Sequence, residues 1–532
     1  MRLFRMKSGQ ARLRLVKAGA AIAAAALVAG CGNNYRPVIS PVNPSGPAAQ
    51  PLSYAVVVSA PSPTTPGIAT IIDYAGDSVM AEAPIGPGPT AFAVDILGVN
   101  GYTLNSDGTL TNFPVSSALQ EKYVTYTTLP STAEPVNLFS SSSGLWAADL
   151  CVSDLTAVPC SWDSDPLTSN FSGVDAFTGN PQTFLRSIPL PPTPVAIIGS
   201  GGFGQRVFGI SQGNSPATSG NSTWNNISSG VACNISPSSV AVNGEADGIE
   251  VSSYTVSSQI PLGQCPVFGI ESTDFKRLFV LNRGSDSITV INTQNNALDD
   301  NCPAVNQDGQ PINCPPNGTL QLPHGSGPVY AEYNTATNQL IVANYDGNSI
   351  SVIDTSLDQY GNDGSTFGTT FTVPVGNHPA SVTVLYDGSR AYTANQSDGT
   401  VSIVNLSSHT VEKAALPVIG HPRTVVSTQN SSYGKVYVAS PDSPYLTIIR
   451  TDQDIADTTV LVQGNIVDVR VSTQNGVSGN FNNVSRSPGF GQPCNLPDLP
   501  GGYQVTGAPK GTTVEPTSSL FDCQVQDSSL LK

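Results

Sequence analysis

Three of the four histidines could bring metal-binding or proton-transfer chemistry to one place. His378 and His421 each stand directly before a proline in similar turns, and His324 lies close to the corresponding place in the preceding segment. Neutral imidazole is a common ligand of zinc and copper, and it transfers protons near neutral pH. If the turns meet, three imidazoles could hold a metal. The alternative, which we favour, is that each histidine is a locally hydrogen-bonded turn residue.

Other motifs that could carry chemistry have simpler interpretations. Asp346, Asp398 and Asp442 lack the stepped Asp-x-Asp-x-Asp-Gly spacing of a calcium loop, and turn chemistry explains them better. Gly199–Gly204 resembles a phosphate loop, but no helix follows and no lysine is placed to help. No convincing Ser/His/Asp set can be identified in the sequence. The sequence therefore predicts no catalytic residues and no cofactor.

Cysteine usage indicates disulfides. Apart from Cys31, eight cysteines remain, an even number, and no C-x-x-C pair suggests a thiolate metal site. Proximity in sequence suggests four pairs, although eight cysteines allow 105 pairings. The suggested pairs are Cys151–Cys160, Cys233–Cys265, Cys302–Cys314 and Cys494–Cys523.

A short repeat must position all of these residues. An aromatic or branched residue, two more strand residues and a small polar residue recur eight times, with the closest copies 44 to 46 residues apart. The copies are Val56–Ser59, Tyr102–Asn105, Trp146–Asp149, Phe208–Ser211, Phe279–Asn282, Ile341–Asn344, Tyr392–Asn395 and Tyr437–Ser440. This period matches one four-stranded propeller blade. Arranging such sheets radially buries both faces of each, so the sequence predicts an all-β propeller.

The number of blades follows from the first strand of each unit. Seven such strands are predicted at proline-led stretches, near Pro89, Pro135, Pro194, Pro266, Pro328, Pro379 and Pro422. An eighth candidate, Ile466–Val471, has no later strands, and the stretch from Tyr54 onward has no first strand. Pairing the two would close the ring with eight blades. Seven blades, the more usual number among similar proteins, is the alternative.

The repeat also resembles a known family. Residues 341–355 are similar to the YVTN repeat of bacterial and archaeal surface-layer β-propellers, and residues 391–405 and 278–293 are nearly as similar. The resemblance is strong over about 263–465, weaker over 51–262, and absent after about 475. It implies a propeller at the cell surface or in the periplasm, without a defined chemistry. Sugar-lactone hydrolases share related repeats, and this second hypothesis would use His324, His378, His421 and Glu134.

The first 30 residues form a predicted signal peptide. Residues 1–17 contain six basic residues and no acidic one, and a short apolar run leads to Val28-Ala29-Gly30-Cys31. This end resembles a lipobox, which implies cleavage before Cys31 and its lipidation. Gly32 in the next position implies the outer membrane. The alternative is a soluble periplasmic protein. The predicted order is signal peptide 1–30, Pro/Ser/Asn-rich tether 31–52, propeller 53–474 and irregular tail 475–532.

Charge and insertions suggest the kind of partner. Without the signal peptide, 16 of the 22 basic residues remain against 38 acidic ones, a net charge of −22, which disfavours nucleic acid. Three insertions, after Trp146, Phe208 and Phe279, hold five of the cysteines, and we expect one rim to carry all three. Because rim loops commonly bind partners, the favoured function is binding an envelope protein or cell-wall polymer, not catalysis.

Overall fold

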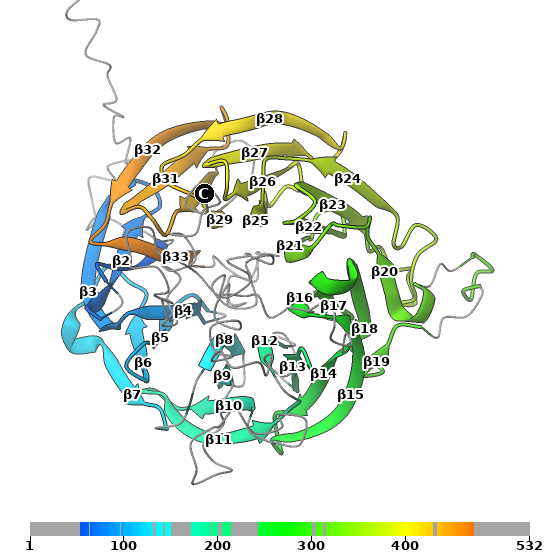
Figure 1. Cartoon of the computed structure of the whole chain (residues 1–532), viewed down its shortest axis with the longest axis horizontal. Coiled ribbons are helices and arrows are strands. Elements are labelled where there is room, and N and C mark those ends of the chain that lie inside the picture. The colour runs from blue at the N-terminus through cyan, green and yellow to red at the C-terminus, as the bar shows by residue number, and fades with distance from the viewer. Residues whose placement is uncertain are drawn as a thin grey trace, which may run out of the picture. The chain divides into compact units, whose positions relative to one another are not determined.

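The computed structural model describes residues 54–62, 64–95, 97–130, 133, 135–141, 144–149, 172–191, 193–199, 205–213, 243–300, 305–311, 315–428 and 434–472. All of these residues belong to one compact unit, Pro51–Lys532. Within this unit, eight antiparallel sheets form a ring (Figure 1). The prediction of an all-β propeller with eight blades is therefore confirmed, and the alternative of seven blades is wrong.

Blade 1 closes the ring by joining the two ends of the described chain. Its strands, from the centre outward, are β33 (Asn465–Val471), β1 (Tyr54–Ala60), β2 (Pro66–Asp73) and β3 (Val79–Pro87). β33 pairs antiparallel with β1, with Val471 opposite Ala55 and Asp468 opposite Val58. This is the pairing that the unpartnered strands of the sequence predicted. It leaves no blade without its innermost strand.

The other seven blades are each continuous in sequence. Blades 2, 3 and 4 contain β4 (Pro89–Val94), β5 (Asn100–Asn105), β6 (Thr109–Pro114), β7 (Thr125–Thr128); β8 (Pro135–Ser141), β9 (Gly144–Asp149), β10 (Gly173–Thr178), β11 (Thr183–Pro189); and β12 (Pro194–Gly199), β13 (Arg206–Ser211), β14 (Asn243–Glu250), β15 (Thr255–Gln264). Blades 5 and 6 contain β16 (Pro266–Glu271), β17 (Arg277–Asn282), β18 (Ser287–Asn292), β19 (Ala297–Leu298), β20 (Thr319–Gln321); and β21 (Pro328–Asn334), β22 (Gln339–Asn344), β23 (Ser349–Asp354), β24 (Thr370–Pro374). Blades 7 and 8 contain β25 (Pro379–Val384), β26 (Arg390–Asn395), β27 (Thr400–Asn405), β28 (Thr410–Pro417); and β29 (Thr424–Ser427), β30 (Lys435–Ala439), β31 (Tyr445–Arg450), β32 (Ile455–Leu461).

Helices contribute little to the described chain. They are three short 3-10 turns, η1 (Glu121–Tyr123), η3 (Arg283–Ser285) and η4 (Pro316–Gly318). No helix in the described ranges has the length and apolar character needed to cross a membrane.

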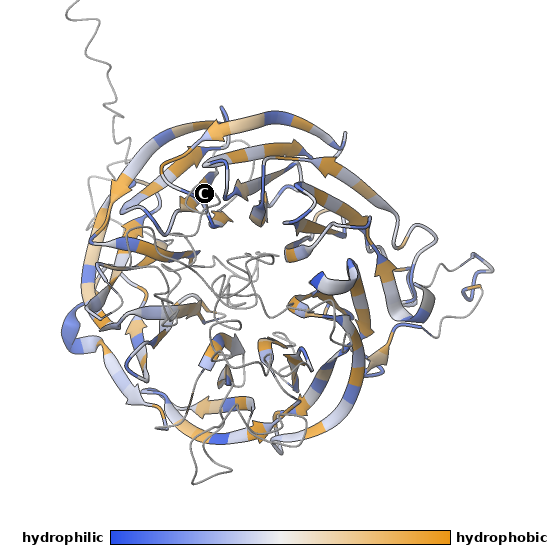
Figure 2. Cartoon of the chain, in the orientation of Figure 1, coloured by the Kyte–Doolittle hydropathy of each residue, from blue (hydrophilic) through white to orange (hydrophobic). Residues whose placement is uncertain are grey.

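The apolar core lies between neighbouring blades. One cluster joins Leu104 of blade 2 to Leu145 of blade 3, and another joins Tyr392 of blade 7 to Val436 of blade 8. Each sheet therefore buries its faces against the next sheet, as the radial arrangement requires. Figure 2 shows the same pattern, with apolar residues along the strands and polar residues in many turns.

A Gly-x-x-Pro turn leads into four of the blades, and a buried asparagine explains its glycine at Gly86, Gly263 and Gly376 but not at Gly325. Asn344, at the end of β22, donates from Nδ2 to Ser349 Oγ (3.1 Å) and Ser351 Oγ (2.9 Å). Asn105, Asn282 and Asn395 bond to the equivalent hydroxyls of blades 2, 5 and 7. A Cβ on Gly376 would lie 2.6 Å from Cγ of Asn395. Only glycine leaves room for the amide, so the turn and the asparagine belong to one device.

Ion pairs join several blades at the start of their second strands. Arg277 of blade 5 contacts Asp363 of blade 6 (Nη2–Oδ1 2.8 Å), and its Nε also lies 2.6 Å from Asp299 Oδ2. Arg390 of blade 7 pairs with Asp454 of blade 8, and Lys435 of blade 8 pairs with Asp77 of blade 1. These ion pairs connect blades that also share apolar contacts. We call the group of Arg277, Asp299 and Asp363 the clasp between blades 5 and 6.

Candidate functional site

One face of the ring gathers the turns that the sequence singled out. We call it the proline face. It consists of the connections between second and third strands and of the links that lead to each proline-led innermost strand. The links between blades 1 and 2, 5 and 6, and 6 and 7 hydrogen-bond to the turns of both blades that they join. For example, Val375 N donates to Asn348 O of blade 6, and Gln396 N of blade 7 donates to His378 O (2.9 and 3.0 Å). The turns therefore form one continuous surface.

Residues before the prolines have an unusual backbone conformation. Thr193, Cys265 and His378 adopt φ values of 64°, 50° and 52°, in the left-handed region that most side chains avoid. The carbonyl of each accepts a hydrogen bond from the following second-to-third-strand turn. The strained conformation therefore serves the link between blades, whatever the side chain is.

The predicted histidines all lie on the proline face but do not come together. His378 Nδ1 lies 2.6 Å from Ser397 Oγ, and His421 Nδ1 lies 2.6 Å from Asp442 Oδ2. His324 is fully exposed, with its Nδ1 3.2 Å from Asp286 Oδ2. Each ring thus has a different partner.

No three His, Cys, Asp or Glu side chains in the described ranges are grouped so as to hold a metal ion. Each of the three imidazoles instead contacts a side chain of a neighbouring turn.

Arg283, Tyr345, Asp346 and His378 form a group that was not predicted from the sequence, and we call it the Tyr345 cluster. Arg283, in η3 of blade 5, makes a two-pronged ion pair with Asp346 of blade 6 (Nε–Oδ2 2.9 Å and Nη2–Oδ1 2.7 Å). Its guanidinium lies 5.4 Å from the centroid of the Tyr345 ring. That ring stacks on His378 of the next link at 4.6 Å. Three successive units of the ring are thereby tied together at one spot.

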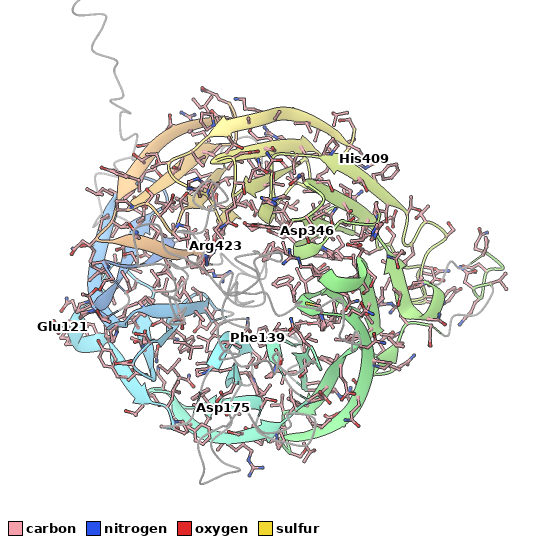
Figure 3. The ribbon with its side chains drawn as sticks, viewed as in Figure 1. Glu121, Phe139, Asp175, Asp346, His409 and Arg423 are labelled. Atoms are coloured by element: carbon pink, nitrogen blue, oxygen red, sulfur yellow. The ribbon has the colours of Figure 1, made fainter. Side chains whose placement is uncertain are left out.

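Residues of the Tyr345 cluster differ in exposure. Arg283 and Tyr345 are buried, whereas the Asp346 side chain is 39% exposed. The sequence explained Asp346 by its Asp-Gly turn alone. Its partner lies 63 residues away, and no local pattern marks such a pair. Figure 3 places Asp346 at the inner margin of the ring.

Buried charges also approach the centre of the ring. Arg423, just before β29, is 2% exposed, and burial lowers the pKa of its guanidinium to about 9 although Asp468 and Tyr345 oppose the shift. On β33, Arg470 Nη2 lies 2.8 Å from Asp468 Oδ2. Figure 3 shows Arg423 and Asp346 on the same side of the centre, at the inner margin of the ring, with blade 7 between their blades. Charged groups of blades 8 and 1 therefore lie near the side chains of the Tyr345 cluster.

The three insertions do not share one rim, so that expectation was wrong. The insertion after Trp146 joins β9 to β10, and the insertion after Phe208 joins β13 to β14; both are attached at the proline face. The third separates β19 from β20, which form the outermost position of blade 5. There, Asp308 accepts hydrogen bonds from Gln359 and Tyr360 of blade 6. The third insertion therefore belongs to the outer edge of the ring.

Several predicted features lie outside the described residues. They are the signal peptide 1–30, the tether 31–52 with Cys31, the tail 475–532 and Glu134. Of the eight candidate cysteines, Cys265 is described; it is buried and disulfide-bonded. Cys151, Cys160, Cys233, Cys302, Cys314, Cys494 and Cys523 are not described, so all four pairings stay predictions.

Ser397 and His378 are the described pair on the proline face that most resembles a catalytic arrangement. The contact between Ser397 and His378 has the distance of a nucleophile and its base. However, the imidazole is stacked on Tyr345, and the backbone N–H of His378 donates to Asn348 Oδ1 (2.8 Å). His378 therefore forms part of the contact between blades 6 and 7. Exposed carboxylates, amides and imidazoles on a rigid frame offer hydrogen bonds to a partner.

Comparison with known proteins adds structural likeness only. No protein-family model and no curated protein matches the chain, so the YVTN similarity stays a resemblance. AztD from Citrobacter koseri is 11% identical over 79% of this chain and 97% of that one, with a TM-score of 0.49. A putative 6-phosphogluconolactonase from Bacteroides fragilis is 14% identical over 80% and 99%, with a TM-score of 0.45. Kuenenia stuttgartiensis hydrazine synthase is 16% identical over 64% and 89%, with a TM-score of 0.40. These values are too low to assign a function.

Proposed function

We propose that this protein is a cell-envelope lipoprotein whose propeller binds an envelope protein or a cell-wall polymer through the proline face. The observation that carries the proposal is that the Tyr345 cluster and the attachment points of two insertions lie on the same face of the ring. Loops and turns held by a rigid scaffold are a common binding architecture. The net charge of −22 after removal of residues 1–30 favours a partner that is not nucleic acid.

Pairing of the polar groups favours binding over catalysis. Asp346 already neutralises Arg283, and Asp442 lies against His421. Catalysis needs a group whose proton or electron pair is available to a substrate. Groups that are paired and partly exposed are better suited to a surface that recognises a partner through hydrogen bonds.

The envelope location rests on the sequence of the amino terminus. The basic residues, the apolar run and the lipobox-like end at Cys31 support export and lipid anchoring, with the outer membrane as the destination. Replacing Cys31 with serine should release the protein from the membrane fraction into the periplasmic fraction. Retention of C31S in the membrane fraction would contradict lipid anchoring at this residue.

Binding can be tested with matched surface variants. The mature chain is incubated with purified cell-wall sacculi and, separately, with detergent-solubilised envelope proteins, and the bound fraction is measured. H421A combined with D346N should reduce binding several-fold, because both side chains are partly exposed on the proline face. The control, D387N, alters an aspartate of the turn between β25 and β26, on the opposite face, and should leave binding unchanged. Equal binding by all three proteins would refute the role of the proline face.

A further inference from the structure

Blade 4 breaks a rule that most of the propeller keeps. In blade 6, Asn344 at the end of the second strand bonds to two hydroxyl residues of the third strand, Ser349 and Ser351, and we call this group the asparagine–hydroxyl device. The position of Ser351 is a serine or threonine in six blades: Thr70, Thr111, Thr289, Ser351, Ser402 and Thr447. Blade 4 has Asp247 in this position, paired across the sheet with Gly209. Its neighbours in the device are also changed, because Ser211 replaces the asparagine and Glu245 replaces the first hydroxyl residue. A neutral hydrogen-bonded group has become two carboxylates and a hydroxyl.

Strand geometry brings these three side chains to one spot. Ser211 is directly opposite Glu245, and Asp247 follows two residues later, so all three project from the same face of the sheet. In the sister blades, the equivalent polar atoms lie 2.8–3.3 Å apart. In blade 4, Gln259 Nε2 also donates to Glu245 Oε1 (3.0 Å).

The spot faces an apolar wall. A Cβ added to Gly209, beside Asp247, would meet Leu190 at 2.2 Å and Val174 at 3.2 Å, which identifies blade 3 as the facing surface. Asp247 is 1% exposed and Ser211 is fully buried. Within the described part of the chain, neither Asp247 Oδ2 nor Ser211 Oγ has a hydrogen-bond partner.

The charge of this spot is not balanced by the described residues. Glu245 and Asp247 are two residues apart on β14 and project from the same face of the sheet, so their carboxyl groups lie in one apolar setting. None of the ion pairs between described residues joins Glu245 or Asp247 to an arginine, lysine or histidine. Two neighbouring carboxyl groups in an apolar setting need a positive charge or a shared proton between them.

We propose that Glu245, Asp247 and Ser211 form a binding site for a hard divalent cation such as Ca²⁺. The donors are all oxygens, which suit calcium or magnesium, and neither histidine nor cysteine is present to favour zinc or copper. Ser211 Oγ supplies a buried oxygen that has no other partner among the described residues. Glu245 is only partly buried, which gives a cation and its remaining water ligands a route in. The proposal is independent of the proposed function.

The test uses the whole mature chain after treatment with a chelator and dialysis. Its melting temperature is measured at pH 7.5 with and without CaCl₂ or MgCl₂, at concentrations up to the millimolar range. A cation present at about 100 times its Kd should raise the melting temperature by about 3 °C for a domain of this size. D247N should abolish the rise in melting temperature. D398N changes an exposed aspartate in the turn between β26 and β27 and should keep the rise.

Further measurements make the outcome decisive. If D247N does not fold, E245Q replaces it, and binding is also measured directly by titration calorimetry with CaCl₂. A rise in wild type that either variant abolishes supports the site. The proposal is overturned if neither cation raises the melting temperature of wild type or gives binding heat, which would mean that Asp247 and Glu245 share a proton. A rise that D247N or E245Q retains overturns it as well.

Discussion

The clasp between blades 5 and 6 allows a quantitative prediction. Arg277 is 2% exposed, and its guanidinium contacts Asp299 (2.6 Å) and Asp363 (2.8 Å) while donating to Gly361 O (3.2 Å). Replacing Arg277 with methionine leaves two carboxylates buried without their counter-charge. Removing one partner of a buried ion pair costs about 3–5 kcal/mol.

Conversion to a melting temperature uses the size of the propeller. The described strands span roughly 420 residues, from Tyr54 to Val471, and at about 2.1 cal/mol/K per residue 1 kcal/mol corresponds to about 1 °C. R277M should therefore melt about 3–6 °C below wild type in differential scanning calorimetry at one fixed scan rate. The control R450M removes a partly exposed pair with Asp452 and should change the melting temperature by less than about 1 °C. Equal melting temperatures for R277M and wild type would show that the clasp does not hold the blades.

Three other predictions concern the same frame. Burial, and then the Asp299 carboxylate, raise the pKa of Asp363 to about 7, so the folded state holds this proton more tightly than the unfolded state does. The contribution of Asp363 to stability is therefore greatest at low pH and falls as the pH rises from about 4 to 7. D363N should reduce the dependence of the melting temperature on pH over this range. An unchanged dependence would contradict the assignment. N344A removes a buried amide that bonds to two hydroxyls and should lower the free energy of unfolding, measured with urea, by about 1–3 kcal/mol. The control N405A changes an asparagine at the partly exposed end of β27 and should lower it by less than about 0.5 kcal/mol. A chain that ends at Gly464 lacks β33 and should lose cooperative unfolding in near-ultraviolet circular dichroism, because blade 1 then has no innermost strand; retained cooperativity would mean that the ring does not need this closure.

Local signals in the sequence predicted the frame well. Proline is tolerated at the first residue of an edge strand, and six innermost strands begin at the predicted prolines. The closing pair of β33 and β1 could be predicted because each strand lacked a partner within its own repeat. Both inferences use information that is near in sequence or periodic.

Contacts between blades could not be predicted in the same way. Arg283 and Asp346 are 63 residues apart, and Arg277 and Asp363 are 86 residues apart. Which side chain meets which depends on the angle between blades and on turn geometry, neither of which leaves a local pattern. The division of the insertions between the proline face and the outer edge was missed for a related reason. Their lengths were visible in the sequence, but the strand positions that they interrupt were not.

Acidic residues occupy positions of the asparagine–hydroxyl device in two neighbouring blades. Blade 3 has Asp149 and Asp175 where blade 6 has Asn344 and Ser351, and blade 4 has the Glu245 and Asp247 pair. Both blades also carry an insertion between their second and third strands, at the proline face. Exchanging a neutral hydrogen-bonded device for buried carboxyl groups costs stability unless a proton or a cation compensates. Folding alone gives no reason for the exchange, and a cation bound in blade 4 would also stabilise the strands to which its inserted loop is attached.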